Sequence, residues 1–160
     1  MRFSIPVYFF ISLMVVMASS CQGKKNADTT ETSKTVPGIP TYPALNNEAL
    51  SRLYAETDKV DIIFYNLPIS VNQDEASSAK NTALYVSPAS PNITKVCQPI
   101  GRLTWISKGA ILKDADIYCE PGCQYFVFME NNSPVAANAM VQGGIDFFNN
   151  IISQVPKPKE

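Results

Sequence analysis

Residues 100–140 constrain the fold most, because short apolar segments alternate there with turn residues. The segments are separated by Lys108-Gly109, by Glu120-Pro121-Gly122 and by Asn131-Asn132. Glycine and asparagine accept the positive φ angles that tight hairpin turns require. The pattern therefore predicts an antiparallel β-meander of four strands, which cover residues 100–107, 110–119, 123–130 and 134–140.

The third of these strands contains the continuous apolar run Tyr125–Met129. Such a run is typical of a strand that is covered on both faces. We expect Phe126, Val127 and Phe128 to lie in the core.

Helices are predicted before and after the meander. Charged residues recur every three or four positions from Glu48 to Lys59, and apolar residues fill the opposite side. This spacing predicts an amphipathic helix that is capped by Asn46 or Asn47 and ends near Pro68. The β-branched residues of VDIIFY also allow a different reading, in which the helix gives way to a strand at Asp58.

Two further helices complete the predicted domain. Residues 72–75, Asn-Gln-Asp-Glu, have the form of a capping box with Asn in place of Ser, and an alanine-rich helix follows them to about Val86. The last helix covers IDFFNNIIS, residues 145–153. The sequence thus predicts one α+β domain over residues 44–154, in which two N-terminal helices and one C-terminal helix pack on a four-stranded antiparallel meander, with a tail at 155–160.

The residues before this domain have no apolar periodicity. Residues 22–43 are polar and then rich in proline. Such a composition cannot bury a core, and its prolines favour extended backbone. We expect residues 21–43 to form a disordered spacer.

The first twenty residues have the composition of a signal peptide. Arg2 is followed by the apolar run Phe3–Met17 and by the small residues Ala18-Ser19-Ser20, which are typical of a cleavage site. Cys21 comes directly afterwards, and this arrangement resembles the lipobox of bacterial lipoproteins. The resemblance implies that Cys21 is acylated and anchors the protein to a membrane of the cell envelope, outside the cytoplasm. An ordinary secretory signal that is cleaved elsewhere is the alternative.

Three cysteines belong to the predicted domain: Cys97, Cys119 and Cys123. A hairpin centred on Lys108-Gly109 places Cys119 next to Cys97, and a turn centred on Pro121 places Cys119 opposite Cys123. We therefore expect the three sulfurs to converge at one end of the sheet. An oxidising compartment favours one disulfide, which joins Cys97 to the hairpin. A soft-metal site or a thiol-redox centre that uses the three cysteines is the alternative.

Composition excludes several classes of chemistry. The chain has no histidine, which removes Ser-His-Asp and Cys-His catalysis and histidine-ligated metals. It has no glycine-rich nucleotide loop, and we expect no cofactor. Cleavage before Cys21 leaves 12 basic and 14 acidic residues, a net charge of −2. Without a basic stripe, nucleic acid is not an expected partner.

One candidate ligand face remains. In the registers above, Trp105, Asp114, Asp116 and Tyr118 share a sheet face with Phe126 and Phe128. Carboxylates beside aromatic rings suit the binding of a sugar or an amine. The two aspartates can also be read as a paired general acid and base. In the competing interpretation these residues are structural: a bulge in the second strand reverses the alternation, or the aspartates lie at solvated positions while the aromatic residues pack under the helices.

The sequence therefore predicts a non-enzymatic lipoprotein of the cell envelope that acts as a binding or interaction module. Its expected partners are the membrane, through the lipid, and either an envelope protein or a small ligand. The alternative is a thiol-dependent metal-binding or redox protein that uses Cys97, Cys119 and Cys123.

Overall fold

The computed structural model describes residues 40–155. The predicted signal peptide, the lipidation site Cys21, the spacer up to residue 39 and the tail from residue 156 lie outside the described residues.

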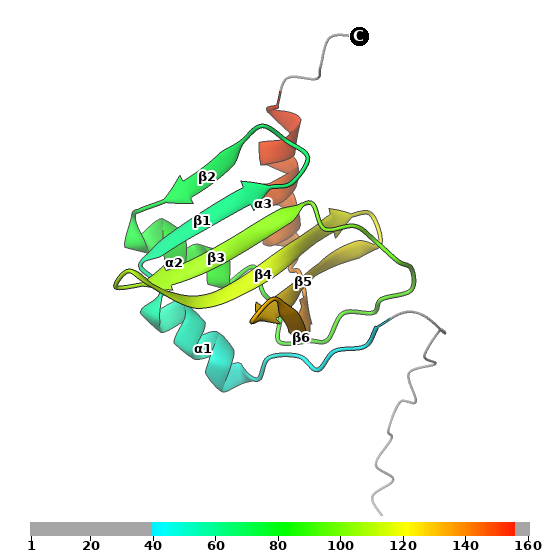
Figure 1. Ribbon diagram of the computed structural model, residues 1–160, viewed down its shortest axis with the longest axis horizontal. Helices are drawn as coiled ribbons and strands as arrows, with labels where there is room; N and C mark the ends of the chain where they lie inside the picture. The colour runs from blue at the N-terminus through cyan, green and yellow to red at the C-terminus, as the bar shows by residue number, and fades with distance from the viewer. Residues whose placement is uncertain (1–39, 156–160) are drawn as a thin grey trace, which may run out of the picture. The chain divides into compact units, whose positions relative to one another are not determined.

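The described residues form an α+β domain, as predicted, but its sheet has six strands rather than four (Figure 1). The strands lie in the order β2-β1-β3-β4-β5-β6, and all neighbours are antiparallel. The elements in chain order are α1 (Asn47–Glu56), β1 (Lys59–Phe64), β2 (Ser70–Gln73), α2 (Ala76–Ala83), β3 (Gly101–Ser107), β4 (Ala110–Glu120), β5 (Cys123–Glu130), β6 (Ser133–Ala139) and α3 (Gln142–Ser153).

The predicted meander is confirmed as β3 to β6. Lys108 and Gly109 have φ angles of 50° and 79°, and Asn131 and Asn132 have 51° and 59°. Two consecutive positive φ angles match type I′ turns, whose twist suits a hairpin. Gly122 follows Pro121 with a φ of 79°, the arrangement expected of a type II turn.

The long helix predicted up to Pro68 is wrong, and the split into helix and strand is correct. Helix α1 ends at Glu56, where the N–H of the C-cap residue Thr57 donates to Leu53 O. From there burial alternates with the period of a strand: Val60, Ile62 and Phe64 are buried, whereas Ile63 is 60% exposed. A period of two cannot keep one helical face buried, so the chain continues as β1.

The capping box predicted at residues 72–75 is also wrong. Asn72 lies in β2, pairs with Asp61 of β1 and donates a side-chain hydrogen bond to its carboxylate. Strand pairing thus uses the residue that would have capped the helix. Helix α2 begins at Ala76, after Glu75, and it ends at Ala83, before Val86.

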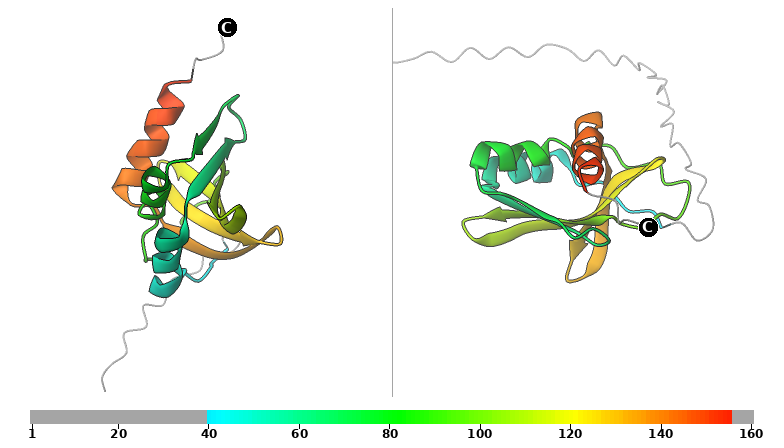
Figure 2. Two further views of the ribbon diagram at one scale, coloured as in Figure 1. Left: turned by 90° about the vertical axis from the view of Figure 1, so that its left-hand side faces the viewer. Right: turned by 90° about the horizontal axis from the view of Figure 1, so that it is seen from above.

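The three helices lie together on one side of the sheet (Figure 2). The face beneath them, here called the helix face, contributes the fully buried Trp105, Ile117, Phe126 and Phe128 to the main core. The indole Nε1–H of Trp105 donates to Thr82 Oγ1 of α2 at 2.8 Å. This bond satisfies the polar atom of the largest core side chain. No helix in residues 40–155 is long and apolar enough to cross a membrane.

The opposite, open face is covered at its β5–β6 end by two segments without helix or strand, whose Tyr42, Ile93 and Cys97 pack against Tyr125, Val127 and Ala137. Residues 40–46 reach β6 where Ala137 N donates to Pro43 O, and residues 87–100 reach it where Ala139 N donates to Ala89 O. The fully buried Asn138 joins both segments, since its side chain accepts from Leu45 N and donates to Ser87 O. Residues 40–43, which the sequence assigned to the spacer, therefore lie against the sheet.

Candidate functional site

The predicted ligand face is divided between the two sides of the sheet. Ile106 pairs with Ile111, but Trp105 pairs with Lys113, so Leu112 is an extra residue in β4. This β-bulge shifts the register by one position, so Trp105 does not share a face with Asp114 and Asp116. The β4–β5 hairpin turns on two central residues and pairs Phe126 with Ile117 and Phe128 with Ala115. Trp105, Phe126 and Phe128 therefore lie in the core on the helix face. Asp114, Asp116 and Tyr118 remain together on the open face.

The three cysteines do not converge. The second hairpin closes with Glu120 opposite Cys123, which places Cys119 opposite Gln124 and on the helix face. Cys123 lies on the open face, where its sulfur is at disulfide distance from that of Cys97; their Cα atoms are 6.4 Å apart. The turn has two central residues, Pro121 and Gly122, whereas the expected register centred it on Pro121 alone.

Cys119 lies apart from this pair and is 6% exposed. Its sulfur is 3.9 Å from Asn149 Oδ1 of α3. Burial raises the pKa of the Cys119 thiol to about 11, so the thiolate that metals and electrophiles require is scarce at neutral pH. Within residues 40–155, no three Cys, Asp or Glu side chains gather as a metal-binding group.

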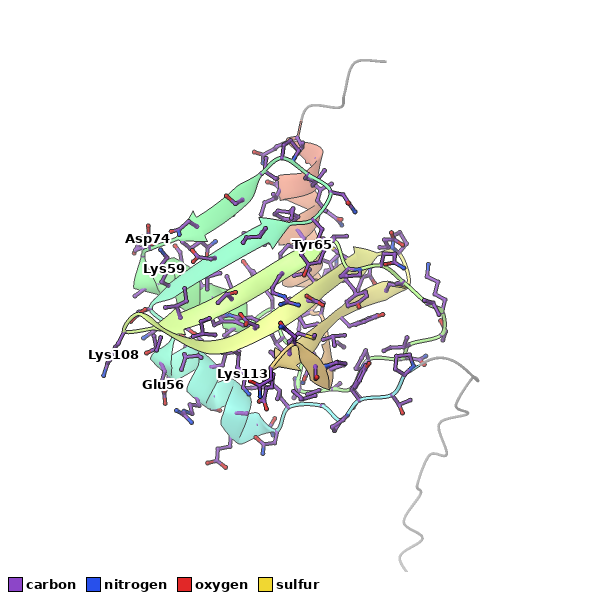
Figure 3. The ribbon with its side chains drawn as sticks, in the orientation of Figure 1. Glu56, Lys59, Tyr65, Asp74, Lys108 and Lys113 are labelled. Carbon is purple, nitrogen blue, oxygen red and sulfur yellow. A yellow bond between two sulfur atoms is a disulfide. The ribbon has the colours of Figure 1, made fainter. Side chains whose placement is uncertain are left out.

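Hydrogen bonds engage both aspartates of the open face. Thr104 Oγ1 donates to Asp114 Oδ1 at 2.7 Å. Asp116 Oδ1 accepts from Arg102 Nε at 2.9 Å and from the Tyr65 hydroxyl at 2.7 Å. Tyr65, labelled in Figure 3, extends over the open face from the end of β1. Each aspartate therefore bonds to partners of its own, and no hydrogen bond joins the two carboxylates within residues 40–155.

Asp116 in turn affects its two donors. The hydrogen bond to Asp116 is the main cause that raises the pKa of Arg102, so this residue stays positively charged. Burial, and then the bond to Asp116, raises the pKa of the Tyr65 hydroxyl. Arg102 and Asp116 therefore form a neutral pair on the open face.

A cleft next to this pair forms the candidate site, which we call the tyrosine groove. Its walls are Tyr42 of the N-terminal segment, Tyr118 of β4, Tyr125 of β5 and Val96 of the 87–100 segment, and Asp116 also lines it. The volume is about 250 Å³. The rings of Tyr118 and Tyr125 stack with centroids 4.5 Å apart and planes inclined by 18°.

The hydroxyls of Tyr42, Tyr118 and Tyr125 make no hydrogen bond to another group within residues 40–155, unlike that of Tyr65, and none of the three is buried without a partner. Burial, followed by the proximity of Tyr118 and Tyr42, raises the pKa of Tyr125 to about 12. Burial, followed by Asp116 and Tyr42, also raises the pKa of Tyr118. Both phenols therefore remain protonated at neutral pH and can donate as well as accept.

Of the groove residues, Asp116 and Tyr118 belong to the predicted ligand face. Tyr125 could have been added, because the correct hairpin register places it opposite Tyr118. The sequence did not indicate a binding role for Tyr42, because this residue lies between prolines in a segment that resembles a spacer.

A larger cavity, of about 480 Å³, lies between α1 and β4. Two of its charged residues already have partners: Arg52 pairs with Glu56, and Lys113 pairs with Glu130. Its one large exposed apolar side chain is Ile111. The tyrosine groove combines aromatic walls with unpaired polar atoms and is the better candidate.

Comparisons of the chain with protein-family models, with curated proteins and with solved structures find no match.

Proposed function

We propose that this protein is a lipid-anchored binding module of the bacterial cell envelope and that its ligand occupies the tyrosine groove. The observation that carries the proposal is the groove itself. Three tyrosines from three separate segments converge on the sheet face that the helices leave open. Their hydroxyls make no hydrogen bond within the described part of the chain and are not buried, so a ligand can reach them. A concave aromatic site with a few convergent polar groups is the usual form of a small-molecule site.

The same residues favour binding over catalysis. Asp116 is held by Arg102 and Tyr65, and Asp114 is held by Thr104. Cys119 lies on the other face of the sheet, with a raised pKa. An activated nucleophile needs an adjacent base or a lowered pKa, and the groove residues offer neither.

The anchor follows from the lipobox-like position of Cys21. Pro40 lines the groove, so the chain enters the domain beside the proposed binding site. A fully extended chain from Cys21 to Pro40 would span at most about 70 Å. The groove would therefore work within that distance of the membrane surface.

Site-specific photo-cross-linking in intact cells tests the proposal. A benzophenone amino acid replaces Val96, which is 74% exposed and lines the groove. The matched control replaces Leu84, which is 56% exposed at the end of α2 on the helix side of the sheet. We expect an adduct in the membrane fraction from position 96 alone. Equal adducts from both positions, or none from position 96, would count against a ligand in the groove.

A further inference from the structure

We propose that the tyrosine groove binds one neutral sugar ring of a saccharide. This inference rests on the proposed function and adds the chemical class of the ligand. The polar atoms of the groove provide the first argument. Asp116 uses only Oδ1 for Arg102 and Tyr65, so its second oxygen is available to accept a hydrogen bond. The three tyrosine hydroxyls can each donate or accept. Sugar hydroxyls also do both, so one polyol ring can satisfy the whole set.

The apolar walls suit the other side of such a ring. Val127 and Met129 line the groove together with the stacked pair of Tyr118 and Tyr125. The C–H groups on one face of a pyranose are weakly positive, and aromatic ring faces carry negative charge density. Stacking on a tyrosine therefore leaves the sugar hydroxyls free to reach the polar atoms at the rim.

The size of the groove limits how much of a ligand it can hold. Its volume of about 250 Å³ is below the range of roughly 300–1,000 Å³ that is typical of sites for drug-sized molecules. A single ring fits this space, and the remainder of a longer saccharide would extend into solvent.

The charges disfavour a cationic ligand. Asp116 is already neutralised by Arg102 at 2.9 Å, so it offers little attraction to an amine or a quaternary ammonium. Lys95 also lines the groove and keeps its positive charge while its Nζ donates to Pro121 O at 2.9 Å. An anion would meet the free oxygen of Asp116, which accepts hydrogen bonds and does not donate them, so we favour a neutral ligand.

A proline-rich peptide is the main competitor, because such peptides bind aromatic grooves. Proline residues, however, lack an N–H donor. They would leave the free oxygen of Asp116 without a partner. A sugar hydroxyl can supply that donor, and for this reason we favour the saccharide.

Titration calorimetry and ligand-observed NMR on the full chain test the inference. The protein is kept in a zwitterionic detergent, because a maltoside or glucoside would compete for the groove. The probes are glucose, galactose, mannose, N-acetylglucosamine and their short oligomers, with decaproline and tetramethylammonium as competing classes. We expect binding of at least one saccharide. Tyr118→Phe and Tyr125→Phe should each weaken it about 3- to 10-fold, because each removes one hydrogen bond.

Tyr54→Phe is the matched control, since Tyr54 is exposed on α1 and lies outside the groove. It should leave the affinity unchanged. Saccharide binding that Tyr118→Phe and Tyr125→Phe leave intact would overturn the inference. Binding of decaproline or tetramethylammonium without any saccharide would overturn it too, but the groove would remain a ligand site. Absence of every ligand, together with no adduct from position 96, would overturn the proposed function as well.

Discussion

At the scale of single residues, the reactivity of Cys119 tests whether this cysteine is buried on the helix face, apart from Cys97 and Cys123. Its pKa of about 11 lies above the ordinary value of 9.0 because the side chain is buried under the helices. At pH 8 the thiolate fraction is therefore about 100-fold smaller than in the unfolded chain. We expect iodoacetamide to alkylate Cys119 at least that much more slowly in the native protein than in urea. Equal rates would mean that Cys119 is not buried.

The same shift makes stability depend on pH. The folded state holds the proton of Cys119 more tightly than the unfolded state, so the stabilisation is complete below pH 9 and is lost as the pH rises toward 11. The loss approaches roughly 2–3 kcal/mol. Because lysines and tyrosines titrate in the same range, the quantity to measure is the difference between wild type and Cys119→Ala in urea denaturation from pH 8 to 11. The free energy of unfolding of Cys119→Ala should therefore rise relative to that of wild type as the pH increases from 8 to 11.

Single residues also show where sequence reasoning succeeds and fails. The burial of Phe126, Val127 and Phe128 is confirmed, because five consecutive apolar residues leave no polar face to expose. The position of Trp105 was wrong because one bulge residue, Leu112, reverses the alternation of β4. A bulge depends on contacts between strands, and the local sequence contains no distinct sign of it.

At the scale of elements, the 87–100 segment depends on its link to β5. Cys97 and Cys123 are separated by 26 positions, and the chain-entropy treatment gives a disulfide across such a loop about 3.5 kcal/mol of stability. We therefore expect Cys97→Ser to lower the free energy of unfolding by about that amount. Reductant should destabilise wild type to a similar extent and leave Cys97→Ser almost unchanged.

Peptide mapping supplies the matching covalent test. After thiol blocking without reductant, one cross-linked peptide should join Cys97 to Cys123, and Cys119 should carry the blocking group. Three alkylated thiols would contradict the pairing. A link through Cys119 would contradict the assignment of Cys119 and Cys123 to opposite faces.

The elements that were predicted well are those with local signals. The turns at Lys108-Gly109, Pro121-Gly122 and Asn131-Asn132 require backbone angles that few residues adopt. These turn residues therefore made the meander predictable from the sequence. Strand β2 has only four residues, half of them exposed, and no apolar alternation. Its structure comes from pairing with β1, which is a tertiary effect that no short window of sequence reveals.

At the scale of the whole molecule, the anchor and the groove make a joint prediction. If Cys21 is the acylated N-terminus, metabolic labelling with a fatty acid should mark the wild-type protein, and Cys21→Ser should carry no label and leave the membrane fraction. Cys119→Ser is the matched control, because it removes a cysteine of the domain and should keep both the label and the membrane attachment. Equal label in wild type and Cys21→Ser would mean that the signal is an ordinary secretory one.

The Cys21→Ser variant also separates the effect of membrane attachment from that of ligand binding. Residues 40–155 form the groove by themselves, so Cys21→Ser should bind ligand in solution with the affinity of wild type. In cells, however, adducts from a cross-linker at position 96 should become much rarer if the ligand is fixed to the envelope. Release from the membrane removes the high effective concentration that a tether provides. Unchanged cross-linking by the released protein would instead indicate a freely diffusing ligand. The anchor would then only retain the protein at the cell and would not bring the groove to its ligand.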